Sequence, residues 1–206
     1  MLNTKFPMLI ASAFLVNTVT AQKIIVGAKA GIQSTAFTIK STASADKISI
    51  ESPRTGFLLG ITADYRFSPN WSLQPQLLGT MRNGAINIGD SKTRLIALDL
   101  PLNLLYRQEH FFMGAGPNFS YGISAKGIPY DDGEEERDFY APADDGIQLK
   151  RFELGINASL GYEFTSGITV AANYTRGLSP ILNIENEAKV RTRMFGISIG
   201  YLFNKL

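Results

Sequence analysis

Apolar and polar residues alternate with a period of two along eight segments of the chain. In residues 56–67, one parity is apolar and begins with Phe57 and Leu59, whereas the other includes Asp64 and Arg66. Successive side chains of a strand point to opposite faces, so this alternation predicts two-sided β-strands. Each segment reaches the roughly 9–11 residues that a tilted transmembrane strand needs. The eight segments are residues 24–38, 56–67, 71–82, 93–107, 111–124, 152–164, 168–178 and 192–203.

The connections between these segments alternate in length. Residues 68–70, 108–110 and 165–167 are short turns, whereas the other four connections are much longer. Outer-membrane barrels have short periplasmic turns and longer extracellular loops. If both ends of the chain lie in the periplasm, eight strands are joined by three periplasmic turns and four extracellular loops, as found here. The sequence therefore predicts an all-β fold, an eight-stranded antiparallel up-and-down transmembrane β-barrel in the outer membrane.

Aromatic residues gather at the two ends of the predicted strands, with aliphatic residues between them. Aromatic rings favour the membrane interface, where an apolar body meets hydrated headgroups. A soluble sandwich has little reason to sort its aromatic residues in this way. The set beside the short turns and the C-terminus is Tyr65, Phe67, Trp71, Tyr106, Phe111, Tyr162, Phe164, Tyr201 and Phe203, and the set beside the long connections is Phe57, Phe119, Tyr121, Phe152, Tyr174 and Phe195.

The polar parity of the strands would line the barrel interior. In an eight-stranded barrel, this interior is only wide enough for side chains to fill. Buried charges are tolerated when they are paired and hydrogen-bonded, so we expect ion pairs and a lumen plugged by polar side chains, with a selective channel as the alternative. The predicted inward charges are Lys29, Asp64, Arg66, Arg82, Asp99, Arg107, Arg151, Glu153 and Glu163, among the glycines Gly27, Gly31, Gly60, Gly114, Gly116, Gly155, Gly161, Gly196 and Gly200.

Three prolines fall inside predicted strands. Pro75, Pro101 and Pro117 each remove a hydrogen-bond donor from the ladder between strands. We therefore expect them to mark bulges or strand ends.

The first residues have the features of a secretory signal peptide. Lys5 supplies the positive charge, residues 6–16 are apolar, and residues 19–21 are small enough for a cleavage site. An N-terminal anchor fits less well, because the apolar run is shorter than the roughly 20 residues of a spanning helix and Pro7 interrupts it. We expect a signal peptide at residues 1–21 and an outer-membrane β-barrel domain at residues 22–206.

Composition restricts the chemistry that the chain can perform. It has 206 residues, a net charge of +2, no cysteine and one histidine. The near-neutral charge gives no basis for binding nucleic acid, and the absence of cysteine excludes disulfides, thiolate metal sites and a catalytic thiol. The single histidine, His110, lies in a predicted turn. The chain has no second histidine that could act as a general base beside a nucleophile. We predict that the protein is not an enzyme and has no catalytic, cofactor-binding or metal-binding residues.

The third long connection, within residues 126–150, is strongly acidic. It contains Asp131, Asp132 and residues 134–136, followed by Asp144 and Asp145. One interpretation is a solvated loop. The alternative is weak Ca²⁺ binding by the clustered carboxylates, although the spacing matches no EF-hand loop.

Four stretches of sequence resemble one family. They are LDLPLNLLY at residues 98–106, FFMGAGPNFSYG at residues 111–122, FELGINASLGYEF at residues 152–164 and YTRGLSPI at residues 174–181. In this order and spacing, the chain resembles the PorT-like outer-membrane β-barrel proteins of Bacteroidota over essentially all of its mature length. The resemblance implies an eight-stranded outer-membrane barrel. It implies little about activity, because the family is defined by its fold. The member involved in type IX secretion gives the family its name, and other members need not share that role.

Two classes of function remain. In the first, the protein is a monomeric structural or interaction barrel, in contact with outer-membrane lipid and with envelope or secretion proteins. In the second, it is a narrow pore or a lipocalin-like barrel that binds a small ligand. A ligand cavity is lined mainly by apolar side chains, whereas the predicted interior is charged and rich in glycine. The sequence favours the first class.

Overall fold

The computed structural model describes residues 23–41, 54–84, 91–129, 137–141, 148–184 and 188–203. The predicted signal peptide and acidic residues 131–136, 144 and 145 lie outside these ranges. Within them, no helix is long and apolar enough to cross a membrane. The chain forms eight long strands: β1 (Lys23–Ser41), β2 (Arg54–Arg66), β3 (Trp71–Gly84), β4 (Ser91–Gln108), β5 (Phe111–Pro129), β7 (Phe152–Glu163), β8 (Ile168–Gly177) and β10 (Ala188–Leu202).

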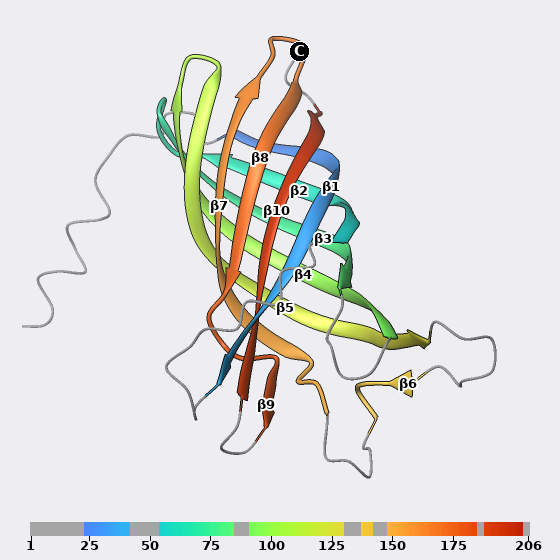
Figure 1. The fold of residues 1–206 in the computed structure, drawn as a ribbon. Helices are drawn as coiled ribbons and strands as arrows, with labels where there is room; N and C mark the ends of the chain where they lie inside the picture. The colour runs from blue at the N-terminus through green and yellow to red at the C-terminus, as the bar shows by residue number, and fades with distance from the viewer. Residues whose placement is uncertain are drawn as a thin grey trace, which may run out of the picture.

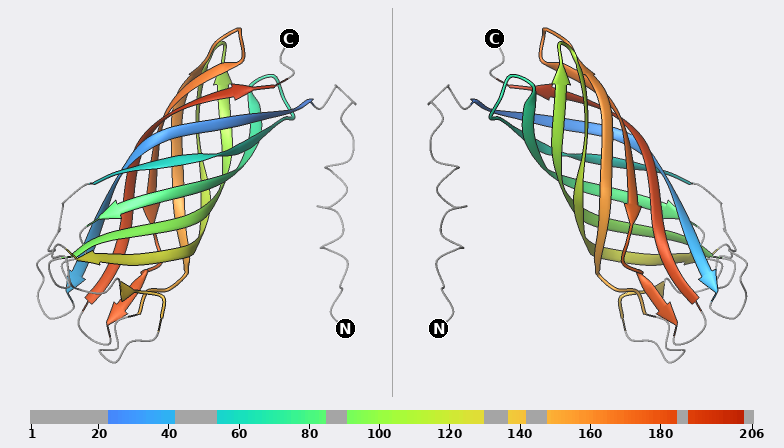
Figure 2. Two further views of the ribbon diagram at one scale, coloured as in Figure 1. Left: turned by 90° about the vertical axis from the view of Figure 1, so that its right-hand side faces the viewer. Right: turned by 90° about the vertical axis from the view of Figure 1, so that its left-hand side faces the viewer.

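The eight strands close into one antiparallel barrel. Each long strand pairs with the next along the chain, and β1 pairs with β10 from Gly27↔Leu202 to Ser41↔Ala188. Closure gives each of the eight long strands two neighbours, so the barrel wall has no free edge. Figures 1 and 2 show the strands wrapped obliquely around one axis. The predicted eight-stranded up-and-down barrel is confirmed, and its strands extend a few residues beyond several predicted boundaries.

The two ends of the barrel differ. At one, the short-turn end, tight connections join β2 to β3, β4 to β5 and β7 to β8 (Figure 1). Two of these turns contain left-handed residues, Glu109 with φ of 54° and Gly167 with φ of 86°. At the other, the long-loop end, two short strands continue the sheet, β6 (Arg137–Asp138) beside β5 and β9 (Leu182–Ile184) beside β10. The predicted alternation of short and long connections is confirmed.

The strand prolines do not mark bulges or strand ends. Pro75, Pro101 and Pro117 lie inside β3, β4 and β5. Beside each of them, pairing with the preceding strand pauses and then resumes in the same register. Proline removes a donor from the ladder, whereas a bulge requires an additional residue in one strand. The expectation of bulges at these positions is therefore wrong.

The bulge lies elsewhere, at Ile123 in β5. Ser124 pairs with Ile96 and Gly122 pairs with Ala97, so Ile123 is an additional residue between them. The insertion reverses the alternation of β5 beyond this point, and Ala125 becomes fully buried inside the barrel. The bulge thus changes which side chains face the interior at the long-loop end.

The outer face is apolar, with aromatic residues at both ends. Leu59 at mid-strand is 67% exposed. At the short-turn end the rings meet in edge-on pairs, including Trp71 and Tyr106 with centroids 5.2 Å apart, and Tyr201 and Phe203 with centroids 5.5 Å apart. The predicted aromatic sets point outward, because all of their members are exposed or half-buried.

Two glycines on neighbouring strands differ in the space around them. A Cβ added to inward-facing Gly60 would overlap the backbone oxygen of Leu77, whereas one at outward-facing Gly79 would lie 3.6 Å from the backbone oxygen of Leu59. The close approach of β2 and β3 therefore requires glycine at position 60 but not at position 79.

We expect Gly60→Ala to lower the free energy of unfolding by about 1–3 kcal/mol, because the methyl group must displace the neighbouring strand. Gly79→Ala, the matched control, should change it by less than about 0.5 kcal/mol. Urea unfolding in lipid vesicles, followed by the fluorescence of the single tryptophan, Trp71, measures both. Equal stability of the two variants would contradict the expectation.

Candidate functional site

Near the short-turn end, four charged side chains form a closed network across the lumen. Arg66 Nε lies 2.8 Å from Asp64 Oδ2, and its Nη2 lies 2.9 Å from Glu163 Oε1. Arg107 contacts the same carboxylates, with Nη2 2.8 Å from Asp64 Oδ2 and Nη1 2.5 Å from Glu163 Oε2. Asp64 is fully buried. β2, β4 and β7 supply these residues, so the network ties strands from opposite sides of the barrel.

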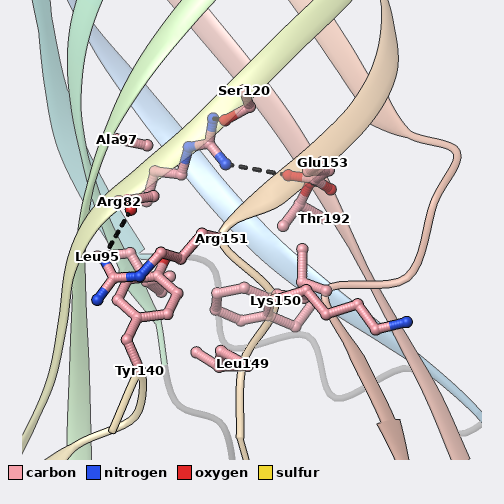
Figure 3. A pocket seen from close by; sticks show the side chains of 13 residues that line it. Arg82, Leu95, Ala97, Ser120, Tyr140, Leu149, Lys150, Arg151, Glu153 and Thr192 are labelled. Carbon is pink, nitrogen blue, oxygen red and sulfur yellow. Dashed lines mark hydrogen bonds and ion pairs between the residues drawn. The ribbon is translucent and has the colours of Figure 1, made fainter.

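A second network lies toward the long-loop end. Arg82 on β3 has Nη2 2.5 Å from Asp99 Oδ1 on β4 and Nη1 3.1 Å from Glu153 Oε2 on β7. It also donates to Ser120 Oγ at 2.8 Å, and Thr192 Oγ1 donates to Glu153. All five residues are buried. Figure 3 shows Arg82 reaching across the interior toward Glu153. Two carboxylates thus share one guanidinium, and hydroxyl groups complete their hydrogen bonding.

Neutral amides fill the space between the two networks. Lys29 Nζ donates to Gln76 Oε1 at 3.1 Å and to Asn173 Oδ1 at 2.9 Å. Asn103 donates to Asn157 Oδ1 at 2.7 Å. The cavity that remains here has a volume of about 30 Å³. This volume is large enough for about two water molecules.

An apolar cap covers the interior at the long-loop end. The cap consists of inward-facing residues of the strands, residues of the connection between β5 and β7, and Ile181 in the connection before β9. Backbone bonds hold the connection in place: Phe139 N–H donates to Ala125 O at 2.8 Å, and Leu149 N–H donates to Phe139 O at 2.9 Å. A cavity of about 10 Å³ remains between the cap and the second network. The buried residues of the cap are Phe37, Leu95, Ala125, Phe139, Tyr140, Leu149, Ile181, Leu182 and Val190.

Tyr140 is the centre of contact between the cap and the barrel wall. A Cβ at Gly122 would collide with its hydroxyl, so glycine makes room for the ring. The guanidinium carbon of Arg151 lies 4.3 Å from the ring centroid. Burial raises the pKa of the Tyr140 hydroxyl above its ordinary value, so the phenol remains neutral at physiological pH. Figure 3 shows Tyr140 and Leu149 on the long-loop side of Arg82.

The structure brings together most of the charges that the alternation placed inside. Asp64 and Asp99 pair with Arg66, Arg82 and Arg107, as predicted. Two members depart from the prediction of ion pairs. Among the described residues, Lys29 has amide partners and no carboxylate within ion-pair distance.

Arg151 is the second departure, because it is exposed and forms no ion pair with another described residue. It precedes the first residue of β7, is exposed, and donates to Gly122 O at 3.2 Å and Ile123 O at 3.1 Å. Strand alternation placed it inside only on the assumption that the strand continued through this position.

Sequence reasoning missed the amides and hydroxyls that complete the networks. Gln76, Asn103, Asn157 and Asn173 all lie on the polar parity of their strands, which was a usable signal. The cap gave no such signal, because Tyr140 and its neighbours lie in a connection without strand periodicity.

His110 lies in the turn after β4, as predicted, but it is fixed in place. Its ring stacks on Tyr162 with centroids 5.3 Å apart, and Nδ1 lies 2.9 Å from Glu163 O. Within the part of the chain that the structure describes, no group of three or more His, Cys, Asp or Glu could hold a metal ion. The prediction that the chain has no catalytic or ligand-binding residues stays a prediction.

Comparisons with known proteins agree with this geometry. Residues 20–183 match the family described as outer membrane protein beta-barrel domain. The chain belongs to this family. Membership of this family locates the protein in the outer membrane. Comparison with curated proteins found no match.

Two solved structures illustrate the likeness. Ail, the attachment invasion locus protein of Yersinia pestis, aligns with a TM-score of 0.53 and 15% identity over 88% of this chain and 99% of its own. Neisserial surface protein A aligns with a TM-score of 0.49 and 14% identity over 86% of this chain and 96% of its own. At this identity, the likeness to Ail establishes the fold alone.

The network at the short-turn end leads to a stability prediction. We expect Arg107→Met to lower the free energy of unfolding by about 3–5 kcal/mol, because two buried carboxylates would share the single guanidinium of Arg66. Adding Glu163→Gln should recover part of the loss, since one uncompensated charge is removed. Urea unfolding in lipid vesicles measures both. A double variant less stable than Arg107→Met alone would contradict the pairing.

Proposed function

We propose that the protein is a monomeric, non-enzymatic outer-membrane barrel with a structural or interaction role, whose contacts with other envelope components are made at its two ends. The filled lumen is the observation that carries this proposal. Two ion-pair networks, an amide layer and an apolar cap occupy the interior in succession. With the interior occupied and the outer wall facing lipid, the connections are the surfaces left for partners.

We infer that the long-loop end faces outward and the short-turn end faces the periplasm. The lengths of the connections support this orientation, since outer-membrane barrels carry their longer loops on the extracellular side. The predicted signal peptide at residues 1–21 fits the same route to the outer membrane.

The size of the internal cavities argues against the alternative functions. They measure about 30 Å³ and 10 Å³, whereas sites for small molecules occupy roughly 300–1,000 Å³. A pore would need the networks of Arg82 and Arg107 to open, which would leave buried charges without partners. A plugged barrel is therefore the better proposal than a lipocalin-like binder or a narrow pore.

We also propose that the chain is a PorT-like member of its family, with envelope or secretion proteins as partners. The four resembling stretches support this narrower assignment. LDLPLNLLY lies in β4 and FFMGAGPNFSYG lies in β5. The two stretches are paired with each other, for example through Leu104 and Ala115. The resemblance thus falls mainly on the barrel wall, and its last stretch, YTRGLSPI, continues past the end of β8 at Gly177 into the connection before β9.

The plugged lumen predicts that the protein does not conduct ions. Protein inserted in planar bilayers should give no stable single-channel conductance, because ions meet the Arg82 and Arg107 networks in series. Insertion is verified by the difference in gel mobility between unheated and boiled samples. A steady open channel from correctly inserted wild-type protein would contradict the proposal.

The location of partners can be tested by photo-crosslinking in cells. We expect a photoreactive residue at Ala141 or Lys150, at the long-loop end, or at Asn70 or Ser166, in the short turns, to capture a defined protein at one end. The control is Leu59 on the lipid-facing wall, which should capture none. Protein adducts at Leu59 but at neither end would overturn the proposed interaction surfaces.

A further inference from the structure

Near the long-loop end, the outer face of β10 carries a ladder of basic side chains. Lys189, Arg191 and Arg193 occupy successive outward positions, while Val190 and Thr192 between them are buried inside. Alternate residues of a strand share a face. The three cations therefore lie in one row along the outer wall.

The neighbouring strand brings a fourth cation to the same place. Arg176 on β8 pairs directly with Arg193, and β8, β10 and β1 lie side by side (Figure 1). Like charges directly opposite one another destabilise a sheet. The ion pairs of the described residues include none of these arginines, and Arg191 Nε is buried without a hydrogen-bond partner there. The arrangement is suited to a negatively charged group from outside the chain.

The aromatic residues below the cluster indicate its depth. Phe195 and Tyr174 form the next outward pair toward the barrel centre, and both are exposed. Aromatic rings on a barrel wall lie at the headgroup level. The arginine pair is two residues further out, roughly 6.6 Å along the strand. Because barrel strands are tilted by roughly 35–45°, the rise along the membrane normal is smaller than this, and the arginine pair lies just on the water side of the rings, within reach of headgroup phosphates.

An apolar groove opens directly beneath the cluster. Its walls include Ile32, Ser34, Phe195 and Ile197, and its volume is about 140 Å³. Ser34 pairs with Phe195, and the next outward pair on the same two strands contains Arg193. The small side chain of Ser34 leaves the space between larger neighbours. Charge and groove are thus continuous on the lipid-facing wall.

We propose that this surface is a binding site for an anionic membrane lipid. An acyl chain lies in the groove at the β1–β10 seam, and the phosphate contacts Arg176, Arg191 and Arg193. Guanidinium groups match phosphate through paired, charge-assisted hydrogen bonds. The proposed orientation, with the long-loop end outward, places the site in the outer leaflet of the membrane. The site itself does not depend on the protein partners proposed above.

Native mass spectrometry of the full chain in detergent tests the site. The probes are dioleoyl phosphatidylglycerol and, as the neutral comparison, dioleoyl phosphatidylcholine. Wild-type protein should retain one phosphatidylglycerol with at least a tenfold preference. The triple variant R176Q/R191Q/R193Q should lose this preference, whereas the charge-matched control K23Q/R94Q/K150Q should keep it. The triple arginine-to-lysine variant, which keeps the charge, should retain part of it.

The groove is tested separately by filling it. Ser34→Phe should weaken phosphatidylglycerol retention at least threefold, and Ala28→Phe, on the same face of β1 nearer the short-turn end, should leave it unchanged. Each variant is first checked for the heat-dependent gel shift of a folded barrel. Equal retention of the two lipids, or equal behaviour of the two charge-neutralised variants, would overturn the site. Binding of inositol hexakisphosphate with no lipid preference would replace it with a soluble polyanion site. None of these results depends on the cross-linking outcome.

Discussion

The narrow interior of a closed eight-stranded barrel is the constraint on which the structure depends. Side chains from opposite walls meet there, and water cannot solvate the charges that the strands carry inward. Each carboxylate of the two networks therefore pairs with a guanidinium from another strand, as Asp64 on β2 does with Arg107 on β4. Removing one partner leaves the other charge buried and unpaired in a medium of low dielectric constant, which is strongly destabilising. The networks thus contribute to a unique arrangement of the strands, and they also close the lumen.

The same constraint explains why the interior changes character along the axis. Between the two networks it is polar, and beyond the second network it becomes apolar, with Leu95 and Ala125 facing inward. The bulge at Ile123 makes this change possible on β5, because it reverses the alternation of that strand. The connection carrying Tyr140 then seals the end by hydrophobic packing, which needs no charged partner.

A filled interior moves function to the outer surfaces. The wall contacts lipid, and its composition is not uniform. Aliphatic residues dominate at mid-strand, aromatic residues lie at the ends, and the basic side chains of β8 and β10 lie together near the long-loop end. The connections at the two ends offer the other contact surfaces. Family membership is consistent with this division, since a shared barrel wall can carry different connections.

The sequence by itself determined the number of long strands, their order, the alternation of their connections and the faces of nearly all their residues. Period-two alternation is a local property of each strand, so it needs no knowledge of the partner strand. Tertiary structure alone decided which charges meet, where the bulge lies, and that Arg151 stacks on Tyr140 and forms no ion pair with another described residue. It also decided that prolines interrupt the ladder without shifting it. These outcomes depend on cross-strand register and on packing between residues distant in sequence, such as Arg82 and Glu153, because closure of the barrel brings them together.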